Sequence, residues 1–254
     1  MDYISLFSGI GGLDLGLDRA GFNCVGMVEI DPYCRTVLNH RWPEVPKHDD
    51  ARTAPAWWAS TRRPAVRLVA GGFPCQPASR MGKRRAQNDP RWGWPWFRDV
   101  VRAVRPEYVL VENVLGLLDA GFDDVLGDLH TLGFDAEWSI VSACAMGAPH
   151  TRERLFVLAY PTGSHGTDAM QIPAPMEGGR DGTGAEGSRT GGAGWLPEPA
   201  VDRVAYGVPR AVGLEELTAL GNAVVPQVGE YMGHLIAAHA RLSDSLRASS
   251  CHSA

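Results

Sequence analysis

The 254-residue chain is long enough for one α/β domain with a small appendage, and its 44% hydrophobic residues suffice for a single large core. Its formal net charge of −5 argues against a protein that coats nucleic acid non-specifically, because such proteins are usually basic. Neither a signal peptide nor a membrane span is expected, because the start lacks a basic region and no apolar run reaches about 18 residues.

The five cysteines are odd in number, scattered, and form no Cys-x-x-Cys pair: Cys24, Cys34, Cys75, Cys144 and Cys251. This spacing argues against a disulfide framework and against a zinc site, so no metal is expected. It favours a reducing compartment, the cytoplasm, in which a reactive thiol can persist.

Strand and helix signals alternate along the first 160 residues. Short apolar runs predict strands at 4–7, 24–30, 68–70, 108–111, 137–143 and 155–160. Helical patterns cover 13–20, a segment that opens at Asp31-Pro32, 97–104 and 123–132. This alternation predicts a doubly wound, mostly parallel α/β sheet, closed by a strand pair at 137–143 and 155–160.

The composition changes after residue 160, and four segments follow from it. Residues 1–160 form the α/β domain, and 161–203 form a short insert crowded with Gly, Pro, Ser and Thr. Residues 204–240 hold two helices, at 214–220 and 228–239, that complete the domain. The polar tail at 241–254 is expected to be disordered.

A glycine-rich turn, from Phe7 to Gly12, separates the first strand from the first helix. Glycines there let a ligand approach the backbone, and Glu29 ends the next strand, where a carboxylate can accept bonds from ribose hydroxyls. The turn lacks the full dinucleotide fingerprint. A purely structural turn is the alternative, but the pairing with Glu29 favours a nucleoside-containing cofactor.

A second turn, Gly71-Gly72-Phe73-Pro74-Cys75-Gln76-Pro77, follows the third strand. It lies at the carboxyl end of a strand, where open α/β sheets place their chemistry. A cysteine bracketed by prolines in a loop is an unusual core residue. We interpret Cys75 as a nucleophile, with a small buried thiol as the alternative.

Six segments, in order along the chain, resemble the motifs of the DNA cytosine-5 methyltransferase family. They are Phe7–Gly12, Val28-Glu29-Ile30-Asp31, Gly72-Phe73-Pro74-Cys75-Gln76, Glu112-Asn113-Val114, Arg152-Glu153-Arg154 and Gly221-Asn222-Ala223-Val224-Val225-Pro226. They span most of residues 3–240 and leave out chiefly the glycine-rich insert. The resemblance implies a Rossmann-like methyltransferase fold and a small bacterial or phage-type enzyme with a reduced recognition region.

The resemblance also implies roles for the catalytic residues. Cys75 adds to C6 of a flipped cytosine, Glu112 protonates or binds N3, and C5 then accepts a methyl group from S-adenosylmethionine. Arg154 contacts the base, whereas Arg152 is structural or faces a phosphate. The chemistry requires the thiolate, so the surroundings of Cys75 must support loss of its proton.

For the cofactor, the resemblance implies stacking of Phe7 near the adenine, ribose bonds to Glu29, and Ile30 and Asp50 beside the adenine ring. Pro74 and Asn222 approach the methionine portion. The full expected set is Phe7, Ser8, Gly9, Ile10, Gly11, Gly12, Glu29, Ile30, Asp50, Pro74, Asn222, Ala223 and Val224.

Double-stranded DNA is the expected partner, with the segment after Cys75 as a loop that closes on it. Because the whole chain is acidic, DNA binding needs a local cationic patch, and this segment supplies one. The expected DNA-binding residues are Gln76, Ser79, Arg80, Lys83, Arg84 and Arg85. A solvated charge run is the alternative. We expect a monomer, with a restriction endonuclease as a further partner within the same system.

Four other functions are weighed against this interpretation. An RNA cytosine-5 methyltransferase shares the fold, but the Cys-Phe-Thr element of that branch is absent from the sequence. A nicotinamide-dependent oxidoreductase fits the glycine turn but leaves the Pro-Cys and Glu-Asn-Val segments without a role. A non-catalytic relative has no support while Cys75 and Glu112 are both present. An enzyme with a variant methyl donor fits the same scaffold. The recognition sequence in DNA does not follow from these residues.

Overall fold

The computed structural model describes residues 1–75, 92–164, 203–204, 208–209 and 214–250. Its main sheet has seven strands in the order β3-β2-β1-β4-β5-β7-β6, and β7 runs antiparallel to both of its neighbours while the remaining pairs are parallel. The strands are β1 (Asp2–Leu6), β2 (Asn23–Val28), β3 (Lys47–His48), β4 (Leu68–Gly71), β5 (Tyr108–Asn113), β6 (Phe134–Val141) and β7 (Arg154–Pro161). The prediction of a doubly wound, mostly parallel sheet is confirmed.

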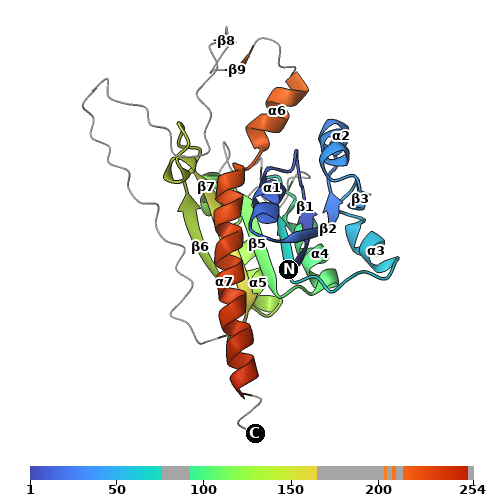
Figure 1. Cartoon of the computed structure of the whole chain (residues 1–254), viewed down its shortest axis with the longest axis vertical. Coiled ribbons are helices and arrows are strands. Elements are labelled where there is room, and N and C mark those ends of the chain that lie inside the picture. Colours follow the sequence, from blue (N-terminus) through green and yellow to red (C-terminus); the bar gives the residue numbers. More distant parts are fainter. Residues whose placement is uncertain (76–91, 165–202, 205–207, 210–213, 251–254) are drawn as a thin grey trace, which may run out of the picture.

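Helices cover both faces of this sheet (Figure 1). The helices of the described residues are α1 (Gly12–Arg19), α2 (Pro32–Arg41), α3 (Ala54–Ala59), α4 (Trp94–Val104), α5 (Phe122–Thr131), α6 (Leu214–Asn222), which lies beyond the ends of the strands, and α7 (Pro226–Ser250), with short 3-10 turns at Leu115–Asp119 and Ala143–Met146. At the start of α2, the Asp31 carboxylate accepts a bond of 2.9 Å from the backbone N–H of Cys34, which confirms the predicted cap.

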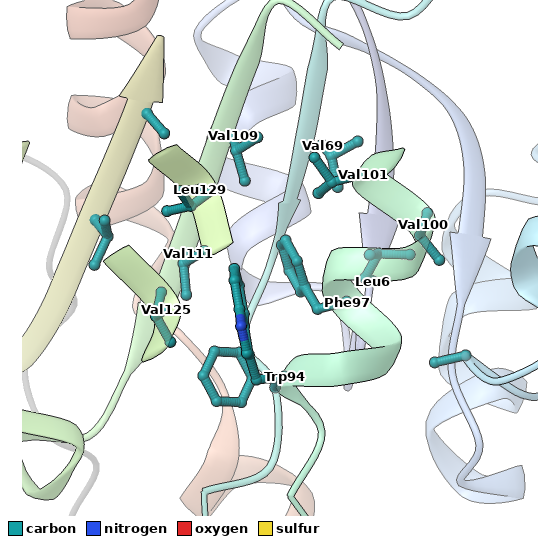
Figure 2. Close-up of a cluster of buried hydrophobic side chains, with 14 of the residues drawn as sticks. Leu6, Val69, Trp94, Phe97, Val100, Val101, Val109, Val111, Val125 and Leu129 are labelled. Carbon is teal, nitrogen blue, oxygen red and sulfur yellow. The ribbon is translucent and has the colours of Figure 1, made fainter. Parts of the chain in front are cut away.

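The core has two layers because side chains alternate across the sheet. Val69 and Val111 face α4 and α5, whereas Leu68 and Leu110 face α1 and α7. Figure 2 shows the first layer, in which Trp94 and Phe97 of α4 stack with ring centroids 5.7 Å apart. Trp92 and Trp94 are buried and pack in this layer.

Glycines allow α7 to lie directly on α1. A Cβ added to Gly16 would collide with the backbone of α7 at Pro226, and one added to Gly233 would meet Ala20 at 2.5 Å. This close contact returns the C-terminal part of the chain to the N-terminal strand-helix unit. It brings the segment before α7 beside Gly12, where a Cβ would collide with the carbonyl of Val224.

The C-terminal tail differs from the prediction of disorder at 241–254. Helix α7 continues to Ser250, and two ion pairs tie its last turns to the residues that directly precede β4 and β5. Arg67 binds Asp244 at 3.0 Å, and Arg247 binds Glu107 at 2.9 Å. The polar tail residues thus have partners far away in sequence. Residues 251–254 lie outside the described part of the chain.

The predicted insert at 161–203 lies mostly outside the described residues. Next to it, Arg203–Val204 (β8) and Val208–Pro209 (β9) pair as an antiparallel ribbon. Among the helices of the described segments, none combines the length and apolar character needed to cross a bilayer.

Candidate active site

The candidate site lies where β1, β2, β4 and β5 end. Since the carboxyl ends of parallel strands meet at one edge of the sheet, the turns that follow them converge on a shared cavity of about 670 Å³. Cys75, Glu112, Glu29 and the turn that starts at Phe7 all line this cavity. One space thus holds a thiol, the carboxylates of Glu29 and Glu112 among others, and a glycine turn.

The glycine turn after β1 has a left-handed backbone. Phe7, Gly9 and Gly11 have φ values of 53°, 56° and 82°, of which only the glycine values are easily adopted. The turn also fixes the neighbouring acid: Glu29 accepts bonds from the backbone N–H groups of Gly9, at 2.7 Å, and Asp31, at 2.8 Å. Each carboxylate oxygen is therefore positioned while it still has a lone pair that can accept another donor.

The turn after β4 packs closely against the end of β5 and against two tryptophans. A Cβ on Gly72 would collide with the Glu112 carboxylate, so glycine lets this turn approach the end of β5. The Asn113 amide donates to the carbonyl of Phe73 at 3.0 Å, and the ring of Phe73 packs on Trp92 and Trp94. These contacts fix the backbone that presents Cys75.

Cys75 is 7% exposed, and burial raises the pKa of its thiol to about 11. The resting side chain is therefore a thiol at neutral pH, and only a small fraction is thiolate. Attack on a substrate requires that the proton leave during the reaction or that a bound substrate stabilise the thiolate.

Glu112 is also 7% exposed, and burial raises the pKa of its carboxyl to about 7. The guanidinium groups of Arg154 and Arg152 oppose this shift, and Nε of Arg154 lies 3.0 Å from Oε1 of Glu112. A carboxyl group with a pKa near neutrality can both donate and accept a proton at physiological pH.

Arg152 joins two distant parts of the chain rather than lining this cavity. Its guanidinium donates to the carbonyls of Gly221 at 2.7 Å and Ala223 at 2.5 Å, and its own backbone has a φ of 36°. These contacts fit a structural role for Arg152, which is one of the two roles expected for it. Arg152 lines a second cavity of about 740 Å³, which adjoins the first at Gly12, Arg154, Ala223 and Val224.

The structure brings most of the expected cofactor residues to the first cavity. It is lined by Phe7, Ser8, Gly9, Gly12, Glu29, Ile30, Pro74, Asn222, Ala223 and Val224. Ile10 and Gly11 line the second cavity. Asp50 lines neither, because it follows β3 at the margin of the sheet and its carboxylate is bound by Arg52 at 2.6 to 2.9 Å. The expected DNA-binding residues, 76–85, lie outside the described part of the chain.

The cavity is also lined by residues that were not among the expected site residues, and the polar Asp14 and Asn113 are two of them. Asp14 precedes Leu17 by three positions and so shares its buried helix face, a pattern that would have marked this acid as unusual. Asn113 was noted only as the polar neighbour of Glu112. Its bond to Phe73 joins residues 40 positions apart, which no local pattern indicates.

The part of the chain that the structure describes contains no set of side chains suited to binding a metal ion. No group of three or more His, Cys, Asp or Glu side chains gathers there in a way that could hold an ion. The described cysteines, Cys24, Cys34, Cys75 and Cys144, are all unpaired thiols.

Comparison with known proteins agrees with this architecture. The Type II methyltransferase M.HgiCII of Herpetosiphon aurantiacus is 36% identical over 166 residues, which cover 61% of this chain and 36% of that protein. The Type II methyltransferase M.DsaV of Dactylococcopsis salina is 30% identical over 183 residues, which cover 70% of this chain and 50% of that protein. This chain thus spans about a third to a half of the length of these two relatives.

A crystal structure of a Spodoptera frugiperda DNMT2 mutant superposes with a TM-score of 0.53 at 24% identity and covers 64% of this chain and 50% of that one. At this identity the likeness concerns the fold alone. A family model described as C-5 cytosine-specific DNA methylase matches residues 1–176, which is more than half of the sequence and includes the turns that carry Cys75 and Glu112. The chain therefore belongs to the C-5 cytosine-specific DNA methylase family.

Proposed function

We propose that this chain is a DNA (cytosine-5)-methyltransferase that uses S-adenosylmethionine as methyl donor. The observation that carries the proposal is that Cys75 and Glu112 open into the same cavity as Glu29 and the glycine turn. A nucleophile, an acid and a nucleoside-binding carboxylate are thus available within one space. Family membership supports the choice of cytosine C5.

In this proposal, the Cys75 thiol gives its proton to solvent, and the thiolate Sγ forms a bond to C6 of the cytosine as the C5–C6 double bond opens. Glu112 donates its proton to N3, so the electrons displaced from the ring are stabilised as an enamine and C5 becomes nucleophilic. When bound, S-adenosylmethionine supplies the methyl group that C5 takes. A base then removes the C5 proton, the C5–C6 double bond re-forms as Cys75 leaves as a thiolate, and the N3 proton returns to Glu112.

Arg154 orients the acid in this scheme. Its guanidinium holds Oε1 of Glu112 at 3.0 Å, and the other oxygen, Oε2, lies against Gly72 in the turn that leads to Cys75. Since the pair is largely buried, the orientation of the carboxyl group is fixed before the base arrives, which lowers the cost of reorganisation during the reaction.

The residues of the cavity fit an adenosyl donor. Glu29 is a nearly buried carboxylate fixed by two backbone N–H groups, and ribose offers two hydroxyl donors to it. Pro74 and Asn222 also line the cavity, and the resemblance of their motifs would assign them to the methionine portion. The volume of about 670 Å³ lies within the usual range of small-molecule sites.

The wider organisation is part of the same proposal. Residues 1–160 and 204–240 form the catalytic unit, 161–203 contribute to the choice of target, and 76–85 contact DNA phosphates. The chain acts as a monomer in the cytoplasm, with a restriction endonuclease as a partner in the same system. Its recognition sequence is left to experiment.

Expression in a host that lacks DNA methylation, followed by base-resolution mapping of cytosines, tests the proposal and reveals the target sequence together. We expect 5-methylcytosine within a defined sequence context, and none with the Cys75→Ala variant. Purified protein is then offered duplex DNA and transfer RNA with a labelled donor. Soluble, folded protein that leaves DNA unmodified would contradict the proposal, and labelled transfer RNA would assign the RNA alternative instead.

A further inference from the structure

Asp14 is a buried acid with an incomplete set of partners. It lies in the first turn of α1 and is 0% exposed. Its Oδ1 accepts a bond of 3.2 Å from the hydroxyl of Tyr3, whereas its Oδ2 has no hydrogen-bond partner within the described residues. A buried carboxylate oxygen without a donor is destabilising, so this position requires a reason.

The surroundings of Asp14 add no cation among the described residues. Burial raises the pKa of its carboxyl to about 6, and the nearby hydroxyls of Ser5 and Tyr3 oppose that shift. Asp18, the charged neighbour one turn further along α1, is also an acid. Asp14 is therefore mostly ionised at pH 7.5, and the described interior offers its negative charge no counter-ion.

The place of Asp14 in the cavity indicates what would complete it. Asp14 and Ser5 line the 670 Å³ cavity on the β1 side, and β1 lies between β2 and β4 in the sheet. Glu29 follows β2, and Cys75 follows β4. A donor with its ribose at Glu29 and its methyl group near Cys75 would span the part of the cavity at β1, which Asp14 and Ser5 line.

The chemistry of the donor leaves one suitable group for this point. The ribose hydroxyls are directed to Glu29 and the reactive methyl group is directed to the base. The methionine portion carries an α-carboxylate, which would be repelled by Asp14, and an α-ammonium, which offers a positive charge and three N–H donors.

We infer that Asp14 binds the α-ammonium group of the methionine portion of the donor, an inference that rests on the proposed function. Oδ2 accepts a hydrogen bond from an ammonium N–H while the Tyr3 hydroxyl keeps Oδ1 in place. The donor thus completes the hydrogen bonding of an acid that the protein alone leaves unsatisfied. A charge-assisted bond of this kind contributes a roughly 10- to 100-fold gain in affinity.

The test is a binding cycle with two ligands and the full chain. The ligands are S-adenosylhomocysteine and its deamino analogue, in which hydrogen replaces the α-amino group. Their dissociation constants are measured by calorimetry for the wild type and for Asp14→Asn, which keeps the size of the side chain and removes its charge. Asp18→Asn is the matched control, because Asp18 lies on the same helix and binds the indole N–H of Trp42 at 2.6 Å instead.

The wild type and Asp18→Asn should prefer S-adenosylhomocysteine by roughly 10- to 100-fold, and Asp14→Asn should lose most of this preference while it binds the deamino analogue as before. If Asp14→Asn, shown to be folded by its circular dichroism, discriminates as the wild type does, Asp14 serves water or the fold alone and the inference is wrong. If the folded wild type binds neither ligand, the proposed function fails and the inference fails with it.

Discussion

Replacing Glu112 with Gln tests the role of a near-neutral acid most sharply. Glutamine keeps the size of the side chain and can still hydrogen-bond a base, but it cannot transfer a proton. General acid catalysis typically contributes ~10²- to 10⁴-fold, so methyl transfer should fall by about that factor. The Glu112→Asp variant is the companion, because it keeps the acid and shortens its reach.

The pKa values of Cys75 and Glu112 predict different pH profiles for the wild type and for Glu112→Gln. The productive form combines the Cys75 thiolate with protonated Glu112, whose pKa values are about 11 and about 7. Below pH 7 Glu112 stays protonated, so kcat/KM rises about tenfold per pH unit as thiolate forms. Above pH 7 the gain in thiolate is cancelled by loss of protonated Glu112, so the profile levels off.

Glu112→Gln has no acid to lose, and its lower rate should keep rising through pH 7 without a bend. The assay is transfer of a labelled methyl group to DNA that carries the mapped target, at subsaturating DNA, between pH 5.5 and pH 9. A rate within about threefold of the wild type, or the same bend near pH 7 in the variant, would refute the assignment of Glu112 as the acid.

Two further predictions concern the backbone of the site and the DNA-binding loop. Gly12→Ala should lower the free energy of unfolding by about 1 to 3 kcal/mol and weaken donor binding, because its Cβ would collide with a carbonyl before α7. The control is Gly127→Ala, in an open position of α5, which should be neutral or stabilise the protein by up to about 1 kcal/mol. Equal melting temperatures for the two variants would contradict the close approach of the two segments. Replacing Lys83, Arg84 and Arg85 with Gln should weaken DNA binding and make it less sensitive to salt. In a plot of the logarithm of the binding constant against the logarithm of the salt concentration, the slope should flatten by roughly 0.9 for each phosphate that is no longer neutralised. An unchanged slope would count against the loop assignment.

The order of strands and helices was predictable because each strand of the sheet centre is a short run of apolar residues bounded by turn residues. The start of α2 was equally readable, since Asp31 and Pro32 act through local bonds within one helical turn. The strand ends followed from the same pattern, and with them the convergence of Glu29, Cys75 and Glu112 on one cavity.

The features that the sequence did not reveal depend on contacts between distant residues. Strand β3 has two residues, Lys47 and His48, and no periodicity can identify so short an element. The helical tail depends on ion pairs such as Arg67 with Asp244, 177 positions apart, so a polar composition alone suggested disorder. The Asp50 carboxylate binds Arg52, two residues away, and a resemblance between motifs does not reveal this contact.

The unsatisfied oxygen of Asp14 is another feature that the sequence did not reveal. Its sequence neighbours indicate a buried helix face, but only the three-dimensional arrangement shows that Tyr3 occupies one carboxylate oxygen and leaves the other without a donor among the described residues.

The central claim is a covalent bond between Cys75 and C6 of cytosine, and trapping that adduct tests it most directly. DNA in which 5-fluorocytosine replaces cytosine is incubated with S-adenosylmethionine and the protein, because fluorine at C5 leaves no proton to remove and the adduct persists. We predict a complex that survives denaturing electrophoresis, with the modified cytosine attached by mass spectrometry to the peptide that contains Cys75, and no complex with Cys75→Ser. A folded, donor-binding protein that forms no adduct, or an adduct at another residue, would contradict the account.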